Sequence, residues 1–431
     1  MSLFFNTEPG YDIQNKKSNF TLEGGFGVHL SYKNFFYAEY KYYGGNSSFL
    51  NYQDSSIKYS GIIPGIGGSE ISKRGYKYHG STGYISYSPN KIFNFQIGKD
   101  KNFWGDGYRS LFLSDNALAY PFFKITTNIW KIKYVSLFAW QKEIGAIPGK
   151  TKDKNKFGTF HYLSWNATKR LNFNFFESII WQGEDSNRYR GFDVNYLNPM
   201  IFFRPVEYSL GSSDNAFLGF GFKIKLPLKA QLYGQLLIDE FLLKEIKARN
   251  GWWGNKQSLQ IGLRLFDLLR IKNLEGRCEI NCVRPYTYSH GSVQQNYGHF
   301  NQSLAHPLGA NFVETIGILS YRYKNWFMEG KIIGAVYGAD SLGKNLGHDI
   351  FQTYTTRPRD YGIYTLEGVP VKLLIASAKI SYLIVPEINL EASVGVIIRS
   401  ELSENNYYAP YKTNFVFFSL STALLNEQRD Y

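Results

Sequence analysis

The stretch SLQIGLRLF, residues 258–266, alternates apolar and polar residues along its length. Successive side chains of a β-strand point to opposite faces, so this segment would have one apolar and one polar face. The two sets are Leu259, Ile261, Leu263 and Leu265 against Ser258, Gln260, Gly262 and Arg264. Such a strand suits a wall between lipid and a polar interior.

Segments of this kind recur along the whole chain. We expect about 18 strands, an even number as in bacterial single-chain barrels. They lie near 2–13, 19–32, 35–43, 76–88, 91–98, 122–130, 132–141, 159–168, 171–181, 217–226, 230–239, 257–266, 271–283, 313–323, 326–337, 371–383, 387–399 and 413–425.

The connections between these segments alternate short and long. Tight turns are expected at Lys33-Asn34, Pro89-Asn90, Trp130-Lys131, Lys169-Arg170, 227–229, 267–270, Lys324-Asn325 and 384–386. Long excursions span 44–75, 99–121, 142–158, 182–216, 240–256, 284–312, 338–370 and 400–412. Outer-membrane barrels have short periplasmic turns and long external loops. The pattern therefore predicts an all-β fold: one antiparallel transmembrane β-barrel over 1–431, with both termini periplasmic.

The composition agrees with a barrel of this kind. Aromatic residues make up 18% of the chain, which is high for a soluble enzyme and expected for girdles at two membrane interfaces. Mean hydropathy is only −0.30 because half of each barrel strand is polar. The first residues, MSLFFNTEP, lack the basic region and apolar core of a signal peptide. A Gram-negative outer-membrane location requires export, so we expect a leader that this sequence does not contain.

Other predicted strands also place apolar and polar side chains on opposite faces. The outward sets would be Leu218, Phe220, Phe222, Ile224 and Leu226 in 217–226, and Ile388, Leu390, Ala392, Val394, Val396 and Ile398 in 387–399. The inward sets would include Gly219, Gly221, Lys223 and Lys225, and in 271–283 Glu275, Arg277, Glu279 and Asn281. Turning Arg277 toward the bilayer midplane would cost about 2–4 kcal/mol, so we expect a polar lumen.

The cysteines Cys278 and Cys282 fall on one predicted strand. Four residues of strand span about 13 Å at 3.3 Å per residue, beyond the roughly 7 Å that a disulfide bridges. We expect them to be unpaired residues on the lipid face.

The net charge is +13, but lysine and arginine are spread over loops and polar strand faces. No compact basic block indicates nucleic-acid binding. Membrane lipid, anionic lipopolysaccharide and acidic glycans are the partners we expect, with general solvation of the loops as the alternative.

The loop GKDKNFWGDGYRSLFLSDNALAYPFF, residues 98–123, carries the richest polar chemistry. Trp104 and Tyr108 could stack on sugar rings, and Asp106, Arg109, Asp115 and Asn116 could bond sugar hydroxyls. A glycosidase would need two carboxyls about 5–9.5 Å apart across a cleft, which the sequence does not place. The structural alternative is a loop folded into the barrel mouth, with Arg109 paired to an aspartate.

Two other loops carry candidate contacts. His290, His299 and His306 lie in RPYTYSHGSVQQNYGHFNQSLAHPLGANF, without the spacing of a metal motif, and we interpret them as hydrogen-bonding loop residues or ligand contacts. In NPMIFFRPVEYSLGSSDN, Arg204 could pair with Glu207, and Asp214 with a lysine.

Two short segments raise smaller expectations. Residues 239–249 could form a short helix with a Glu240–Lys244 pair and a C-cap at Asn250-Gly251. GIIPGIGG, residues 61–68, lacks the strand-then-helix context of a phosphate loop and is interpreted as a flexible external loop.

These loop segments resemble the Wzi-type capsule-assembly family of outer-membrane proteins, especially its gliding-motility branch, the RemB-like proteins. The resemblance spans about 75–425 and rests on 98–122, NPMIFFRPVEYSLGSSDNAFLG, YGQLLIDEF, NGWWGNKQSLQIG and RPYTYSHGSVQQNYGHFNQSLAHPLGANF. It implies an 18-stranded outer-membrane barrel that holds capsular polysaccharide at the cell surface, or a role in surface motility. It also leads us to expect that the family's helical element before or against the barrel is absent from this chain.

Three functions follow as hypotheses. The first is a non-enzymatic protein without a cofactor that binds capsular or exopolysaccharide. Its candidate contacts are Trp104, Asp106, Tyr108, Arg109, Asp115, Arg204, Glu207, Trp252, Trp253, Arg284, Tyr286, His290, His299 and His306. The second is a component or partner of a gliding or secretion machine. The third is a diffusion porin, although loops 99–121 and 284–312 are long enough to plug its mouth.

Overall fold

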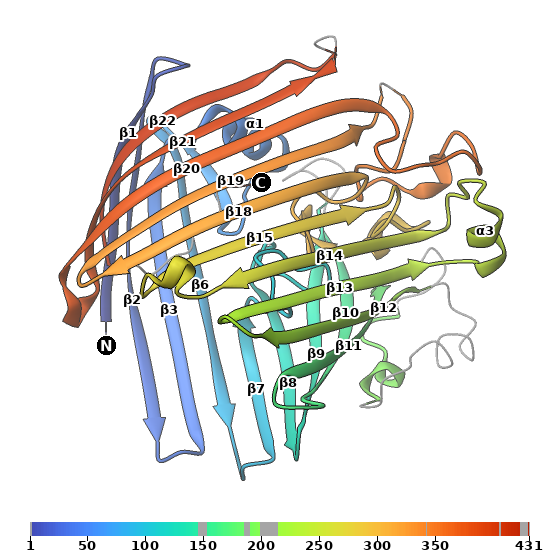
Figure 1. Ribbon diagram of the computed structural model, residues 1–431, viewed down its shortest axis with the longest axis horizontal. Helices are drawn as coiled ribbons and strands as arrows, with labels where there is room; N and C mark the ends of the chain where they lie inside the picture. The colour runs from blue at the N-terminus through green and yellow to red at the C-terminus, as the bar shows by residue number, and fades with distance from the viewer. Residues whose placement is uncertain are drawn as a thin grey trace.

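The fold is a closed antiparallel β-barrel of 18 strands (Figure 1). The computed structural model describes residues 2–144, 153–184, 190–198, 214–341, 343–404, 407–422 and 430. Each barrel strand pairs with its neighbours in the chain, and β1 closes the cylinder by pairing with β22 from Asn6 opposite Ser421 to Asp12 opposite Phe415. The sheet therefore has no free edge, which a barrel in lipid requires.

The barrel strands alternate in direction around the wall. They are β1 (Ser2–Asp12), β2 (Lys17–Tyr32), β3 (Phe36–Ser47), β6 (Gly75–Tyr87), β7 (Phe93–Asp100), β8 (Tyr120–Ile129), β9 (Ile132–Glu143), β10 (Lys154–Trp165), β11 (Leu171–Gln182), β12 (Asn215–Leu226), β13 (Ala230–Glu240), β14 (Lys256–Leu265), β15 (Leu274–Val283), β18 (Phe312–Tyr323), β19 (Trp326–Ala339), β20 (Val369–Val385), β21 (Leu390–Ser403) and β22 (Tyr411–Ser421).

All the predicted strands are present, most of them with ends within three residues of those expected. The largest shift is in β10, which begins five residues early at Lys154. Strands β3 and β21 end four residues late, at Ser47 and Ser403, and β22 ends four residues early, at Ser421. Strand β15 begins at Leu274 because residues Leu268–Arg270 form a 3₁₀ turn in the preceding hairpin.

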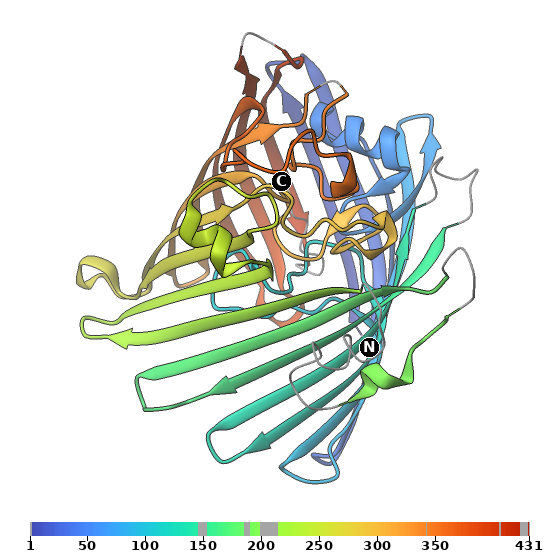
Figure 2. The same ribbon diagram turned by 90° about the vertical axis from the view of Figure 1, so that its right-hand side faces the viewer.

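The short turns and the long loops lie at opposite ends of the barrel (Figures 1 and 2). Non-glycine residues with positive φ make the tight turns, including Lys33, Trp130 and Lys324. The predicted alternation fails at one place, because the first connection on the long-loop side, residues 13–16 between β1 and β2, is also short.

The two faces of the wall follow the predicted alternation. Ile261, Ile280 and Val394 are exposed on the outer face, whereas Gln260, Glu279 and Asn281 are buried inside. Cys278 is exposed and Cys282 is half-buried, and both are free. Of the part of the chain that the structure describes, no helix combines the length and apolar character needed to cross a bilayer.

The long-loop end contains short elements that pack on the barrel. Helix α1 (Asn51–Ser60) was not predicted, and Leu50 and Tyr52 at its start pack on the inner-wall residues Phe415 and Phe417. It is followed by β4 (Ile62–Ile63) and β5 (Gly67–Ser72), which pair across the GIIPGIGG turn.

Helix α3 (Leu243–Ala248) is shorter than predicted. Its C-cap is Arg249 and not Asn250-Gly251. The predicted Glu240–Lys244 pair is not seen, because Glu240 still belongs to β13 and pairs with Lys256 at 3.1 Å.

The remaining short elements lie in loops and turns. They are the hairpin β16 (Gly298–His299) and β17 (Gln302–Ser303), and the 3₁₀ turns Val194–Leu197, Val293–Gln295, Tyr354–Thr356 and Pro386–Ile388.

Candidate functional site

The barrel interior is filled by two of its own external loops. The plug loops, defined here as residues 101–119 and 284–311, run into the lumen and form one apolar core with inward residues of the wall. Leu111, Phe112 and Leu113 are fully buried in it, and the Phe112 ring stacks on Phe176 of β11 with centroids 4.9 Å apart. The sequence-based expectation that these loops are long enough to plug the mouth is confirmed.

Hydrogen bonds join the two plug loops to each other. Tyr288 and Tyr297 of the second loop donate to the carbonyls of Leu111 and Phe112 at 2.9 and 2.6 Å. All four residues are buried, so these bonds are shielded from water. The two loops therefore behave as one packed unit inside the barrel.

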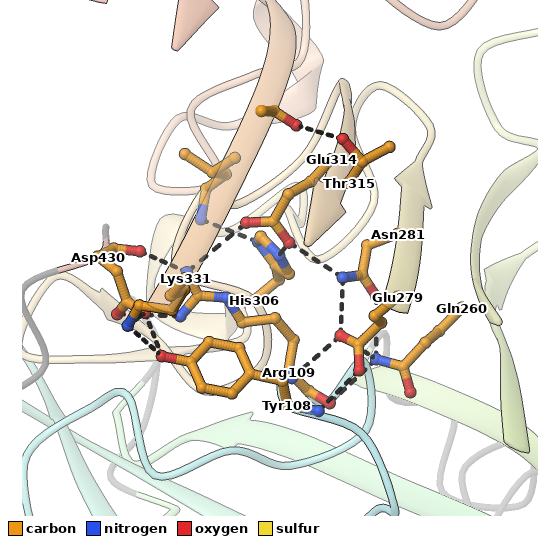
Figure 3. A network of polar contacts seen from close by, with 12 residues as sticks. Tyr108, Arg109, Gln260, Glu279, Asn281, His306, Glu314, Thr315, Lys331 and Asp430 are labelled. Atoms are coloured by element: carbon orange, nitrogen blue, oxygen red, sulfur yellow. Dashed lines mark hydrogen bonds and ion pairs between the residues drawn. The ribbon is translucent and has the colours of Figure 1, made fainter. Parts of the chain in front are cut away.

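A buried ion-pair network fixes the plug to the wall (Figure 3). The Arg109 guanidinium lies 3.6 Å from Glu314 on β18 and 3.5 Å from Asp430 near the C-terminus. Burial alone would lower the pKa of Arg109, but the Glu314 and Asp430 carboxylates outweigh it and raise the pKa. The predicted pairing of Arg109 with an aspartate inside the mouth is confirmed, with Asp430 as the partner.

Glu279 of β15 binds the backbone of the same loop. Its carboxylate accepts the N–H groups of Tyr108 and Arg109 at 2.7 and 3.1 Å, and the hydroxyl of Tyr233 at 2.8 Å. A buried carboxylate needs such donors to offset the loss of water. An inward strand residue thus holds the tip of the first plug loop in place.

Asp430 completes the network on the opposite side of Arg109. Its carboxylate accepts hydrogen bonds from Tyr108 and from Lys331 of β19, the latter at 2.8 Å. Burial would raise the pKa of Asp430, but Arg109 and Lys331 hold it well below its usual range. Burial and the Asp430 charge raise the pKa of Tyr108 to about 12, so Tyr108 remains a donor.

Two further buried lysines hold the second plug loop. Lys156 of β10 donates to Glu143 and to both oxygens of Asn296, and Lys256 of β14 pairs with Asp239 at 2.9 Å while donating to the Ser289 carbonyl. Each lysine joins a wall carboxylate to loop backbone. The plug is therefore anchored at several points around the wall.

The three predicted loop histidines are structural hydrogen-bonding residues. The Nδ1 atoms of His290, His299 and His306 accept the N–H groups of Ser292, Lys142 and Leu308 at 3.2, 3.0 and 3.2 Å. His306 directs its Nε2 to Glu314 at 2.6 Å, so that nitrogen carries the proton. Burial lowers the pKa of His290 to about 4 and that of His299 to about 3, and it also lowers the pKa of His306.

The remaining predicted residues of the first loop are also engaged. Trp104 is 9% exposed and stacks on Tyr162 at 5.4 Å, and Asp106 pairs with Lys223 at 2.5 Å. Asp115 is half-buried and lies in the electrostatic field of Lys101. These side chains serve the packing of the plug.

Trp252, Trp253, Arg284 and Tyr286 gather at the mouth with loop 338–370. Trp253 lies 4.0 Å from the Arg357 guanidinium and 4.7 Å from the Tyr354 ring. Arg284 donates to the carbonyls of Asn255 and Ile363, and the buried Tyr286 donates to Asn345. Trp252 contacts Trp253 at 5.9 Å. This group forms an aromatic and basic surface that partly faces solvent.

The polar segment 198–215 is described only at its two ends. Arg204 and Glu207 lie outside the described residues. The expected lysine partner of Asp214 is wrong, because Asp214 pairs with Arg190 at 2.8 Å. Phe192 and Tyr196 pack on Phe157 and Trp181 at the outer wall.

Sequence reasoning missed Glu314, Lys331 and Asp430 as parts of the network. The available signal was the inward position of Glu314 and Lys331 in predicted strands. The residues that they contact, Arg109 and Tyr108, lie more than 200 positions away in the sequence. Lys331 and Tyr108, for example, are 223 residues apart. A single sequence offers no way to pair them.

These features define the class of protein: a closed β-barrel with an apolar outer surface, whose lumen is filled by its own external loops. No family model matches the chain, and no curated protein matches it in sequence.

Solved structures do resemble it. Wzi of Escherichia coli, an outer-membrane protein involved in group 1 capsule assembly and a carbohydrate-binding β-barrel, is similar with a TM-score of 0.61 and 12% identity over 97% of this chain and 84% of Wzi. OpdK of Pseudomonas aeruginosa, solved with vanillate, has a TM-score of 0.51 at 8% identity, covering 97% and 96% of the two chains. OccAB2 of Acinetobacter baumannii has a TM-score of 0.51 at 10% identity with the same coverage. The chain thus has a Wzi-like outer-membrane barrel fold.

Proposed function

We propose that this protein is a non-enzymatic barrel of the Gram-negative outer membrane that binds polysaccharide at the cell surface and helps to anchor capsule there. The likeness in fold to Wzi, a carbohydrate-binding barrel, supports this proposal. The continuous apolar outer wall supports the location, and the net charge of +13 favours anionic lipopolysaccharide as a neighbour.

The observation that carries the proposal is the filled lumen. Leu111, Phe112, Tyr288 and Tyr297 are all fully buried inside the barrel. A diffusion porin needs a water-filled passage through this space. A barrel with a packed interior is better suited to present its external loops to a surface ligand.

The chemistry of the external loops supports a glycan ligand. Tyr361 and Tyr364 are about half exposed, and Trp253, Tyr354 and Arg357 form a stacked group beside them in the same loop region. Aromatic rings cover the apolar faces of sugars, and polar groups around them fix orientation.

A glycan pulldown tests the proposal. Purified protein in lipid nanodiscs is immobilised and exposed to capsular and exopolysaccharide from the host, with an empty nanodisc as the control. We expect saturable retention on the protein. Failure to retain any host polysaccharide would reject the function. In cells, the deletion strain is expected to shed capsule that the complemented strain retains.

The second candidate is a component or partner of a gliding or secretion machine, which the RemB-like resemblance favours. In that case deletion stops spreading while capsule stays attached to the cells. Scoring capsule and spreading on the same deletion strain separates the two candidates.

A further inference from the structure

Four external loops meet in a cleft of about 280 Å³ at the mouth of the barrel. Its lining includes Pro64 of the β4–β5 turn, Asn116 of the first plug loop, and Asn301 and Gln302 of the β16–β17 hairpin. His348 and Phe351 of loop 338–370 close it. Its volume is near the lower end of the ~300–1,000 Å³ typical of small-molecule sites, which suits a short ligand segment.

Hydrogen bonds between the loops hold this cleft in shape. The Gly65 N–H donates to Gln302 Oε1 at 2.9 Å, and Asn116 Nδ2 donates to the Ser303 carbonyl at 3.1 Å. His348 Nδ1 donates to the Ala310 carbonyl at 2.8 Å, while its ring stacks on Tyr337 at 4.4 Å. The side chains that line the cleft are thus fixed before a ligand arrives, which lowers the entropy cost of binding.

The same side chains keep polar atoms for a ligand. Asn116 Oδ1, Gln302 Nε2, His348 Nε2 and the side-chain amide of Asn301 form no hydrogen bond with the part of the chain that the structure describes. These atoms include both donors and acceptors. Hydroxyl groups both donate and accept, so amide and imidazole groups match them well.

The rest of the lining is mostly apolar, and its carboxylate already accepts hydrogen bonds from the protein. Leu308, Ile350 and Phe351 supply carbon surface next to the amides. Asp349 is the one carboxylate in the lining, and its oxygens accept the Phe351 N–H at 2.9 Å and Gln352 at 3.2 Å. No lysine or arginine is among the described residues that line the cleft. An acidic sugar would meet the Asp349 carboxylate in the lining itself, and the nearby Lys101 ammonium, which lies beside Gly65, is not part of that lining.

We propose that this cleft is a subsite for a neutral sugar segment, with hydroxyls on Asn301, Gln302 and His348 and an apolar ring face on Leu308 and Phe351. This proposal rests on the proposed polysaccharide-binding function and assigns it a place and a ligand class. The net charge of +13 predicts acidic glycans instead, so the local lining and the global charge give opposite expectations.

The test is saturation-transfer NMR on the full chain in nanodiscs. The probes are glucose, galactose, mannose and N-acetylglucosamine, against glucuronate and galacturonate, each at low salt and in 0.5 M NaCl. We expect transfer to at least one neutral sugar, unchanged by salt because no charge pair contributes. Transfer to uronates alone, or binding that salt removes, would overturn the ligand class.

Substitutions in the cleft test whether the sugar binds there. Asn301→Trp fills the cleft, and Asn301→Gly, which keeps the positive φ of 52° at this turn, removes only the amide; both are expected to lose transfer. His348→Phe keeps the stack on Tyr337 but loses both ring nitrogens, for a loss of about tenfold in affinity. Asn195→Trp, at an exposed asparagine of another external loop, is the matched control and is expected to bind like wild type. Heat-modified migration of each barrel checks folding.

The two proposals fail in different ways. If polysaccharide is retained in the pulldown but Asn301→Trp binds single sugars as wild type does, the cleft is not the binding site, whereas the proposed polysaccharide-binding function still holds. If neither polymer nor single sugar binds the wild type, both are rejected.

Discussion

Replacing Arg109 with methionine removes the charge at the centre of the buried network. Two carboxylates, Glu314 and Asp430, would lose a guanidinium within 3.6 Å while staying inside the barrel. Breaking one side of a buried ion pair costs about 3–5 kcal/mol. Lys331 and His306 still contact the two carboxylates, so the lower figure applies. We call the plug undocked when its loops have left their packed position inside the barrel. At about 1.4 kcal/mol for each factor of ten, this undocked state becomes about 100-fold more populated.

Single-channel recording in planar bilayers measures this change directly. Wild type is expected to be silent, and Arg109→Met is expected to open often. The matched control is Lys223→Met, which breaks a second plug-to-wall pair whose side chains are 29% and 18% exposed. A partly exposed pair is screened by water and contributes about 1 kcal/mol, far less than a fully buried one, so this variant should open only about fivefold more often. Equal silence of Arg109→Met and wild type would refute the network as the plug's anchor.

Three other predictions address the plug and the wall. First, His290 and His299 stay neutral in the docked plug with pKa values of about 4 and 3, whereas a solvated histidine has a pKa near 6.5. Acidification from pH 7 to pH 5 therefore favours undocking by about 2 kcal/mol per histidine, and channel openings should increase below pH 6.5; an opening frequency independent of pH would contradict this. Second, Ile261→Lys on the outer face should destabilise the barrel in urea unfolding by about 2–4 kcal/mol, and unchanged stability would place Ile261 away from lipid. Third, in a Cys282→Ser background, Cys278 should react with a water-soluble maleimide in urea-unfolded protein but much more slowly in nanodiscs, and equal rates would mean that lipid does not cover this face.

The wall was predictable from sequence because it follows a two-residue period. Each strand keeps apolar residues outside, as Ile261 and Ile280 illustrate, and polar residues inside, as Gln260 and Glu279 do. Since every connection reverses direction, strand order also follows from the chain itself. These local rules fixed the barrel and the inward set of side chains.

The interior was less predictable because its contacts are long-range. Arg109 was expected to pair with an aspartate, yet Asp430 is 321 residues away. Helix α1 was missed because few apolar side chains mark its sequence, NYQDSSIKYS, and Tyr52 and Ile57 pack in different clusters. The candidate contacts in the first plug loop were identified by residue type, and burial assigns Trp104 and Arg109 to packing instead of to an open surface.

Equilibrium binding of the host's own surface polysaccharide to the nanodisc-embedded protein tests the account most directly. The account predicts saturable binding by the wild type, with the Asn195→Trp control unchanged and the lumen closed to ions. A protein that conducts freely and retains no polysaccharide would contradict it.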